Sequence, residues 1–332
     1  VHLFSFLRAA LVKSFFLCFL AAATLMAGAS ASLIYTVDPK RAVLTDIDSI
    51  SVFKERATKP WLIQEYEHNA ILLGTSKLAH VNPSDIDTPE LTFFNASFSG
   101  ALPEEMFDFL NQFVPEARLV ILSFDLMTMN ELTWGLTGKT FPKPSALRRF
   151  DHTFKYITSM DSLRATFIQL ANPKASPGLL RRNGGRSVPE ELERSAALRT
   201  PHFEKPLTIL RGAAYQSFTY SETRVECIRQ IKALLDERHI PYIALISPED
   251  RQMMETIKDA GSYWALERFR ADMARIFPNV IDYSESWVSD DSNFFNHDPL
   301  HYLPKAGAAM VREAIDKSRD RLSSYNSASA DH

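Results

Sequence analysis

The sequence predicts an α/β fold in which about five parallel strands alternate with helices. The first sign is a set of short apolar runs that stop abruptly at polar or glycine-containing turns; residues 69–73, for example, end at Gly74-Thr75-Ser76. Buried parallel strands that enter a loop have this pattern. The second sign is helical spacing of apolar residues between these runs. The third is length, since 332 residues with 45% hydrophobic content suffice for one large core.

The strands and helices follow in a regular order along the chain. A second apolar run at 91–94 ends at Asn95, and a third at 118–124 ends at Asp125. Between them a helix is expected from Pro103, which implies a right-handed crossover between parallel strands. Later elements are expected as a helix at 221–238, a strand at 242–246, a helix at 263–276, a strand at 280–283 and a helix at 304–322. This order predicts a doubly wound, flavodoxin-like, three-layer sandwich.

Two segments interrupt or extend this pattern. Between about residues 134 and 217 prolines, Gly184-Gly185 and several arginines break the periodicity, which predicts an insertion or cap within a domain that covers 41–325. The last residues, 326–332, are small and polar, and we expect them to form a disordered tail.

The first forty residues have the character of a membrane anchor. Arg8 and Lys13 precede residues 14–37, a run of 24 without a charge, and about 20 apolar residues suffice to cross a bilayer. Cations before the run favour a cytoplasmic N-terminus, so we expect a single-pass bacterial inner-membrane protein whose body lies in the periplasm. The alternative is a signal peptide cleaved after Ala29-Ser30-Ala31, which would release the body into the periplasm.

Composition excludes some classes of partner. The formal net charge of −3 lacks the basic excess of a nucleic-acid-binding protein, so no nucleic-acid partner is expected. Cys18 and Cys227 are far apart and form neither a disulfide framework nor a metal-ligand spacing. We therefore expect no cofactor and no metal.

Candidate catalytic residues follow the predicted strands. Ligands of open parallel sheets bind beyond the carboxyl ends of the strands, where Ser76 and the loop 296–302 are expected. A serine hydroxyl needs an imidazole to take its proton and a carboxylate to orient that imidazole, and His301 and Asp298 could supply these. The backbone N–H groups of Ser76 and Gly100 are candidates for the oxyanion hole.

These residues resemble a known group of enzymes. Gly74-Thr75-Ser76, the Asn95 to Gly100 stretch and Asp298-x-x-His301-Tyr302 look like blocks of the SGNH/GDSL hydrolase superfamily. The layout is similar to its membrane-anchored members in cell-surface polysaccharide O-acetylation, such as alginate acetylation and teichoic acid D-alanylation proteins. The resemblance covers about residues 60–130 and 220–320. It implies an acyl-Ser76 intermediate, with transfer to water or to a sugar hydroxyl, and selects His301 rather than the adjacent His297 as the base.

The resemblance also implies partners, and one block departs from it. A polysaccharide or acylated glycan would be the substrate, and a membrane-bound acyltransferase a further partner. The superfamily's third block usually carries an oxyanion-hole Asn, whereas this chain has Asp125 there; Asn95 or Asn130 could substitute. This departure leaves open a non-catalytic SGNH-fold component that binds glycan or a partner protein. His80 is expected to have a packing or surface role.

Overall fold

The computed structural model describes most of the chain. Described are residues 2–37, 49–51, 55–132, 141, 154, 157–158, 160–171, 179–188, 204–296 and 298–322. These residues form two compact units, one from 1–51 and 144–177 and the other from 52–143 and 178–332. The predicted tail at 326–332 and His297 lie outside the described residues.

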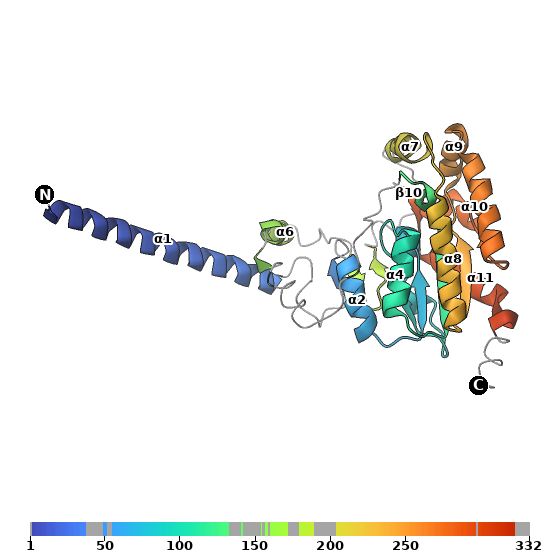
Figure 1. Ribbon diagram of the computed structural model, residues 1–332, viewed down its shortest axis with the longest axis horizontal. Coiled ribbons are helices and arrows are strands. Elements are labelled where there is room, and N and C mark those ends of the chain that lie inside the picture. The colour runs from blue at the N-terminus through green and yellow to red at the C-terminus, as the bar shows by residue number, and fades with distance from the viewer. Residues whose placement is uncertain are drawn as a thin grey trace. The chain divides into compact units, whose positions relative to one another are not determined.

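A five-stranded parallel sheet forms the centre of the larger unit (Figure 1). Its strands, in spatial order, are β3 (Phe93–Asn95), β2 (Ala70–Leu73), β4 (Leu119–Phe124), β7 (Tyr242–Ile246) and β8 (Ile281–Asp282). Each neighbouring pair is parallel. β2 and β4 are buried along their whole length, as their continuous apolar runs require. All five carboxyl ends therefore open onto one edge of the sheet.

Helices flank this sheet. The main ones are α2 (Glu55–Glu65), α4 (Pro103–Phe113), α8 (Glu222–Glu237), α9 (Arg251–Asp259), α10 (Tyr263–Ile276) and α11 (Pro304–Lys317). Alternate residues of the strands, such as Leu72 and Ile121, share one apolar cluster with Met310 and Val311 of α11. α4 and α8 lie side by side (Figure 1). The architecture is an α/β sheet flanked by helices, as predicted.

Shorter elements connect these parts. They are α3 (Ser76–Ala79), β9 (Phe294–Phe295), β10 (Asp298–Tyr302) and the 3₁₀ turns at Pro83–Asp85, Leu126–Met129, Trp287–Ser289 and Asp291–Asn293. β10 pairs with β9 in antiparallel fashion. The segment 296–302 was expected to be a loop, and at 298–302 the structure has this short strand. The polar 55–65 segment was not predicted as a helix, because its apolar residues lack a clear period.

The region predicted as one insertion divides between the two units. Residues 144–177, which include α6 (Met160–Ala171), group with the N-terminal unit. The described residues from 179 onward belong to the sheet-containing unit and include β5 (Leu179–Arg181), β6 (Arg186–Ser187), α7 (Glu204–Leu210) and a π-helical turn at Arg211–Tyr215. β5 and β6 form a hairpin whose turn contains Gly184, at φ +79°.

The N-terminal unit contains one long apolar helix. α1 runs from His2 to Val37, and its segment Phe16–Thr36 has a mean hydropathy of 1.9 over 21 residues. That segment is almost entirely exposed, so it is not the core helix of a soluble fold. Length and composition make α1 able to cross a membrane. A short strand, β1 (Ser49–Ser51), belongs to the same unit.

Candidate active site

Ser76 lies at the carboxyl end of β2 as the first residue of α3. Thr75 caps this helix, and its hydroxyl accepts a hydrogen bond from the Lys77 N–H at 3.4 Å. A Cβ on Gly74 would lie 2.9 Å from the Ser123 carbonyl of the neighbouring strand, so only glycine fits there without movement. The strand therefore turns sharply into α3, and Ser76 is left partly exposed.

Asp298 and His301 lie on β10, which packs against α3. One carboxylate oxygen of Asp298 accepts from the Leu300 N–H at 2.8 Å, and the other accepts from His301 Nδ1 at 2.5 Å. The first bond fixes the carboxylate, and the second orients the imidazole. An Nδ1–H donor leaves Nε2 as an acceptor.

The three predicted catalytic residues meet in space. Ser76 Oγ lies 2.8 Å from His301 Nε2, so the hydroxyl can donate to the imidazole. The side chains of His301 and Asp298 are 17% and 28% exposed, which leaves them accessible to a ligand. Hydroxyl, imidazole and carboxylate thus form one hydrogen-bonded chain across 225 residues of sequence. This geometry is suited to proton transfer.

Asp125 is buried and contacts the two residues that flank Ser76 in the sequence. Its carboxylate accepts a hydrogen bond from the Thr75 hydroxyl and lies 3.3 Å from Lys77 Nζ. Lys77 also donates to Glu249 at 2.7 Å, so one ammonium serves two carboxylates. Burial opposes the charge on Lys77, but these carboxylates outweigh it and raise the pKa of Lys77. Burial, with repulsion from Asp125, raises the pKa of Glu249. Asp125 therefore anchors the turn that carries Ser76.

Asn95 is also buried, and its amide is used within the protein. Its Nδ2 donates to the carbonyls of Leu78 and Val81 at 3.0 and 2.8 Å, and its Oδ1 accepts from the Ser97 N–H. Asn95 thereby secures the end of α3. Gly100 follows five residues later, with φ +57° and open space where a Cβ would be.

Asn130 lies in a different part of the unit. Its Nδ2 donates to the Ala214 carbonyl at 2.7 Å, and its Oδ1 accepts from the N–H groups of Leu132 and Thr219. These bonds join the segment after β4 to the segment before α8. With the amides of Asn95 and Asn130 both engaged, the backbone N–H groups of Ser76 and Gly100 are the remaining oxyanion-hole candidates from the sequence.

His80 contacts the candidate base directly. Its ring packs edge-on against His301, with centroids 5.1 Å apart, and against Phe295 at 5.6 Å. Burial, followed by the nearby His301 and Arg186, lowers the pKa of His80 well below its usual value. A neutral His80 therefore packs against His301, in agreement with the expected packing role.

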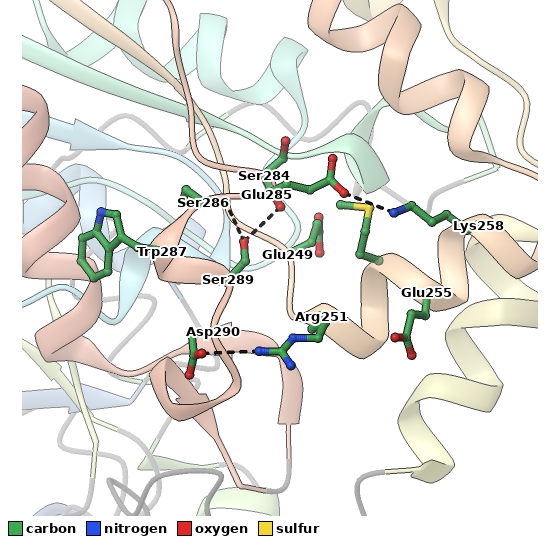
Figure 2. A pocket seen from close by; sticks show the side chains of 11 residues that line it. Glu249, Arg251, Glu255, Lys258, Ser284, Glu285, Ser286, Trp287, Ser289 and Asp290 are labelled. Atoms are coloured by element: carbon green, nitrogen blue, oxygen red, sulfur yellow. Dashed lines mark hydrogen bonds and ion pairs between the residues drawn. The ribbon is translucent and has the colours of Figure 1, made fainter.

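A hollow of about 360 Å³ lies beyond the carboxyl ends of β7 and β8 (Figure 2). Ion pairs Arg251–Asp290 and Lys258–Glu285, at 3.4 and 3.3 Å, flank the labelled Glu249 in this view. Because Glu249 also binds Lys77, the hollow is connected through one side chain to the residue that follows Ser76.

Several residues near the site were not singled out by the sequence. Lys77 and Glu249 form the buried network with Asp125, and Lys59 lies close enough to influence the pKa of His80. Arg186, which also influences that pKa, is one of the arginines that the sequence did single out, as part of the arginine-rich patch at Arg181, Arg182 and Arg186. Lys77 could have been noticed from its place beside Ser76, the candidate nucleophile. Nothing in the local sequence of Lys59 or Glu249 distinguishes them from surface charges.

Comparison with known proteins adds no family assignment. Neither protein-family models nor curated proteins give a match to this sequence. The assignment of function therefore rests on the residues and their geometry.

Proposed function

We propose that this chain is a membrane-anchored serine acyl-transfer enzyme, an O-acetyltransferase or acetylesterase that acts on an exported polysaccharide. The observation that carries the proposal is the bonded chain Ser76–His301–Asp298, with distances of 2.8 and 2.5 Å. A nucleophile bonded to a base, with that base bonded in turn to an orienting carboxylate, is the geometry that an activated serine requires.

The proposed reaction proceeds in two acyl transfers. Ser76 Oγ attacks the carbonyl carbon of an acyl ester as its proton passes to His301 Nε2, and Asp298 stabilises the imidazolium. The tetrahedral intermediate collapses, and the leaving alkoxide takes the proton from His301 while Ser76 retains the acyl group. A water or sugar hydroxyl then gives its proton to His301 as it attacks the acyl-serine. When this second intermediate collapses, the departing Ser76 Oγ takes the proton back from His301, which restores the free site.

The order of the strands supports a finer assignment of the fold. Numbered along the chain, the five parallel strands have the spatial order 2-1-3-4-5, which is that of flavodoxin-like sheets. Ser76 follows the first of these strands, beside the point where the order reverses. An SGNH-type fold accounts for this order and for the positions of Ser76 and His301 together.

The proposed location is the bacterial inner membrane, with the catalytic unit in the periplasm. α1 is long and apolar enough to be the anchor, and Arg8 and Lys13 precede its uncharged segment. An exported enzyme of this chemistry would meet acylated glycans at the cell surface. A membrane-bound acyltransferase would be a suitable source of acyl groups.

Trapping the acyl-enzyme tests the proposal. Detergent-solubilised full-length protein is incubated with p-nitrophenyl acetate, and peptides are examined for acetyl-Ser76. We expect turnover in the wild type and a loss of about 1000-fold or more in Ser76→Ala. Ser292→Ala, at an exposed serine, should keep full activity. Equal turnover in Ser76→Ala and wild type would contradict the proposal.

The second candidate function is non-catalytic binding of glycan or of a partner protein. The observation in its favour is Asp125, which stands where related enzymes carry an oxyanion-hole Asn and is bonded to Thr75 and Lys77 instead. Under this alternative Ser76→Ala would leave glycan retention on an affinity column unchanged, and wild type would show no acetyl-Ser76.

A further inference from the structure

Two basic side chains of α2, Arg56 and Lys59, lie against the loop formed by residues 95–100. Lys59 is fully buried, and its Nζ donates to the carbonyls of Asn95, at 2.9 Å, and Ser97. Arg56 donates to the carbonyl of Ser99 at 2.9 Å. The two side chains thus hold every second carbonyl of this loop.

The N–H groups of the same peptide planes point the other way. In a trans peptide the carbonyl of one residue and the N–H of the next are oppositely directed. Accordingly, the N–H groups that follow the two carbonyls held by Lys59 donate to β2 and its turn: Ala96 to Leu72 at 2.7 Å and Phe98 to Gly74 at 3.1 Å. The third peptide plane joins Ser99 to Gly100. Arg56 binds its carbonyl, and its N–H is that of Gly100.

An acidic partner fixes the far end of the loop. Glu55 accepts hydrogen bonds from the N–H and hydroxyl of Ser99, at 2.8 and 3.1 Å. Arg186, from β6, binds both carboxylate oxygens of Glu55 at 2.8 and 2.7 Å. Burial alone would raise the pKa of Glu55, but its hydrogen bonds to Arg186 and the charges of Lys59 and Arg186 outweigh burial and lower that pKa, so Glu55 stays charged.

We propose that Arg56 and Lys59 are positioning residues that orient three alternate peptide groups of the 95–100 loop, so that the Gly100 N–H faces the nucleophile side as an oxyanion donor. This inference rests on the proposed function and specifies how the oxyanion hole is built without a third-block Asn. Arg56 and Lys59 do not touch the substrate; they act through the loop.

The test compares Lys59→Met and Arg56→Gln with Arg229→Gln, a control at an exposed arginine of α8. In p-nitrophenyl acetate hydrolysis we expect kcat to fall about 10- to 100-fold in each loop variant, with KM nearly unchanged, because orientation of an oxyanion donor acts on the transition state. Hydrogen exchange of amides 96–100 should become faster in both variants and stay unchanged in the control.

Several outcomes separate this inference from the proposed function. Unchanged kcat in Arg56→Gln, which alters the less buried of the two side chains, would overturn the inference, as would a rise in KM at constant kcat. If wild type shows neither turnover nor acetyl-Ser76, the proposed function fails. In that case hydrogen exchange still tests whether Arg56 and Lys59 orient the 95–100 loop. Faster exchange in both variants supports that orienting role, and unchanged exchange overturns it.

Discussion

Lys59 carries an amino group that is wholly enclosed by protein. Burial lowers its pKa to about 7, although Glu55 opposes this shift, whereas a lysine in an unfolded chain has a pKa of about 10.4. Between these two values the folded chain holds Lys59 neutral, and the unfolded chain holds it charged. The unfolded state then binds more protons, so the contribution of Lys59 to stability must increase with pH.

We therefore predict a pH-dependent difference between wild type and Lys59→Met. The free energy of unfolding of wild type, minus that of the variant, should be flat below about pH 7 and rise above it by up to about 1.4 kcal/mol per pH unit. Urea denaturation of the solubilised full chain, followed by tryptophan fluorescence at pH 6 to 9, measures this difference. Lys232→Met, at a partly exposed lysine of α8, serves as control and should give a flat difference. A flat difference for Lys59→Met as well would disprove a neutral buried lysine.

At the site, spacing along the chain predicted which residues meet but not which way buried side chains point. Ser76, Asp298 and His301 were selected because each follows a strand or precedes a helix, and the structure brings them together. Asn95 and Asp125 were selected by the same rule. Their side chains are directed into the protein, where they secure α3 and its cap. That direction depends on distant partners such as Lys77, which no local pattern reveals.

Among the elements, strands with long apolar runs were predicted almost to the residue. The strand 242–246 and the helix 263–276 have the predicted bounds, because burial on both faces or a clear helical period determines each alone. α2 and β10 were missed for a different reason. The charged residues of α2 face the 95–100 loop, and β10 exists because β9 lies beside it. Tertiary contacts of this kind leave no periodic signal.

The β5–β6 turn lies tightly against the strand end that bears Asn95. At Gly184 an added Cβ would lie 2.2 Å from the Asn95 carbonyl oxygen, and φ is +79°. Gly261 has a similar φ of +74°, but nothing lies within 4 Å of its Cβ position. Substituting alanine at each of these two glycines therefore distinguishes the energetic cost of backbone strain alone from the added cost of a steric clash.

We predict that Gly184→Ala is far more destabilising than Gly261→Ala. Gly261→Ala should lower the free energy of unfolding by about 1–2 kcal/mol, because alanine is strained in the left-handed backbone conformation. Gly184→Ala should lower the free energy of unfolding by about 4 kcal/mol or more, because the added methyl group must also displace the Asn95 carbonyl that Lys59 binds. Urea midpoints of the two variants and wild type provide the comparison. Equal losses would mean that the β5–β6 turn does not contact the strand as described.

At the scale of the whole molecule, α1 is the element whose length and composition would allow it to hold the protein at a membrane. Its segment Phe16–Thr36 is long enough to span a bilayer and almost wholly exposed, so in water it would present a large apolar surface. A bilayer removes that surface from water. Ala29-Ser30-Ala31 lies within the same helix, however, and has the small residues that a signal peptidase accepts.

We predict that the chain stays in the membrane fraction after alkaline carbonate extraction, with its N-terminal segment intact. The physical reason is the apolar run, which continues past Ala31 to Val37 and so lacks the polar boundary at which cleavage of a signal peptide leaves a soluble product. Intact-mass measurement of the extracted protein distinguishes the two fates. As a control, Leu25→Arg with Met26→Arg places two charges in the span and should shift the chain to the carbonate-soluble fraction. A soluble wild-type product whose sequence begins after Ala31 would contradict the anchor and assign α1 to export alone.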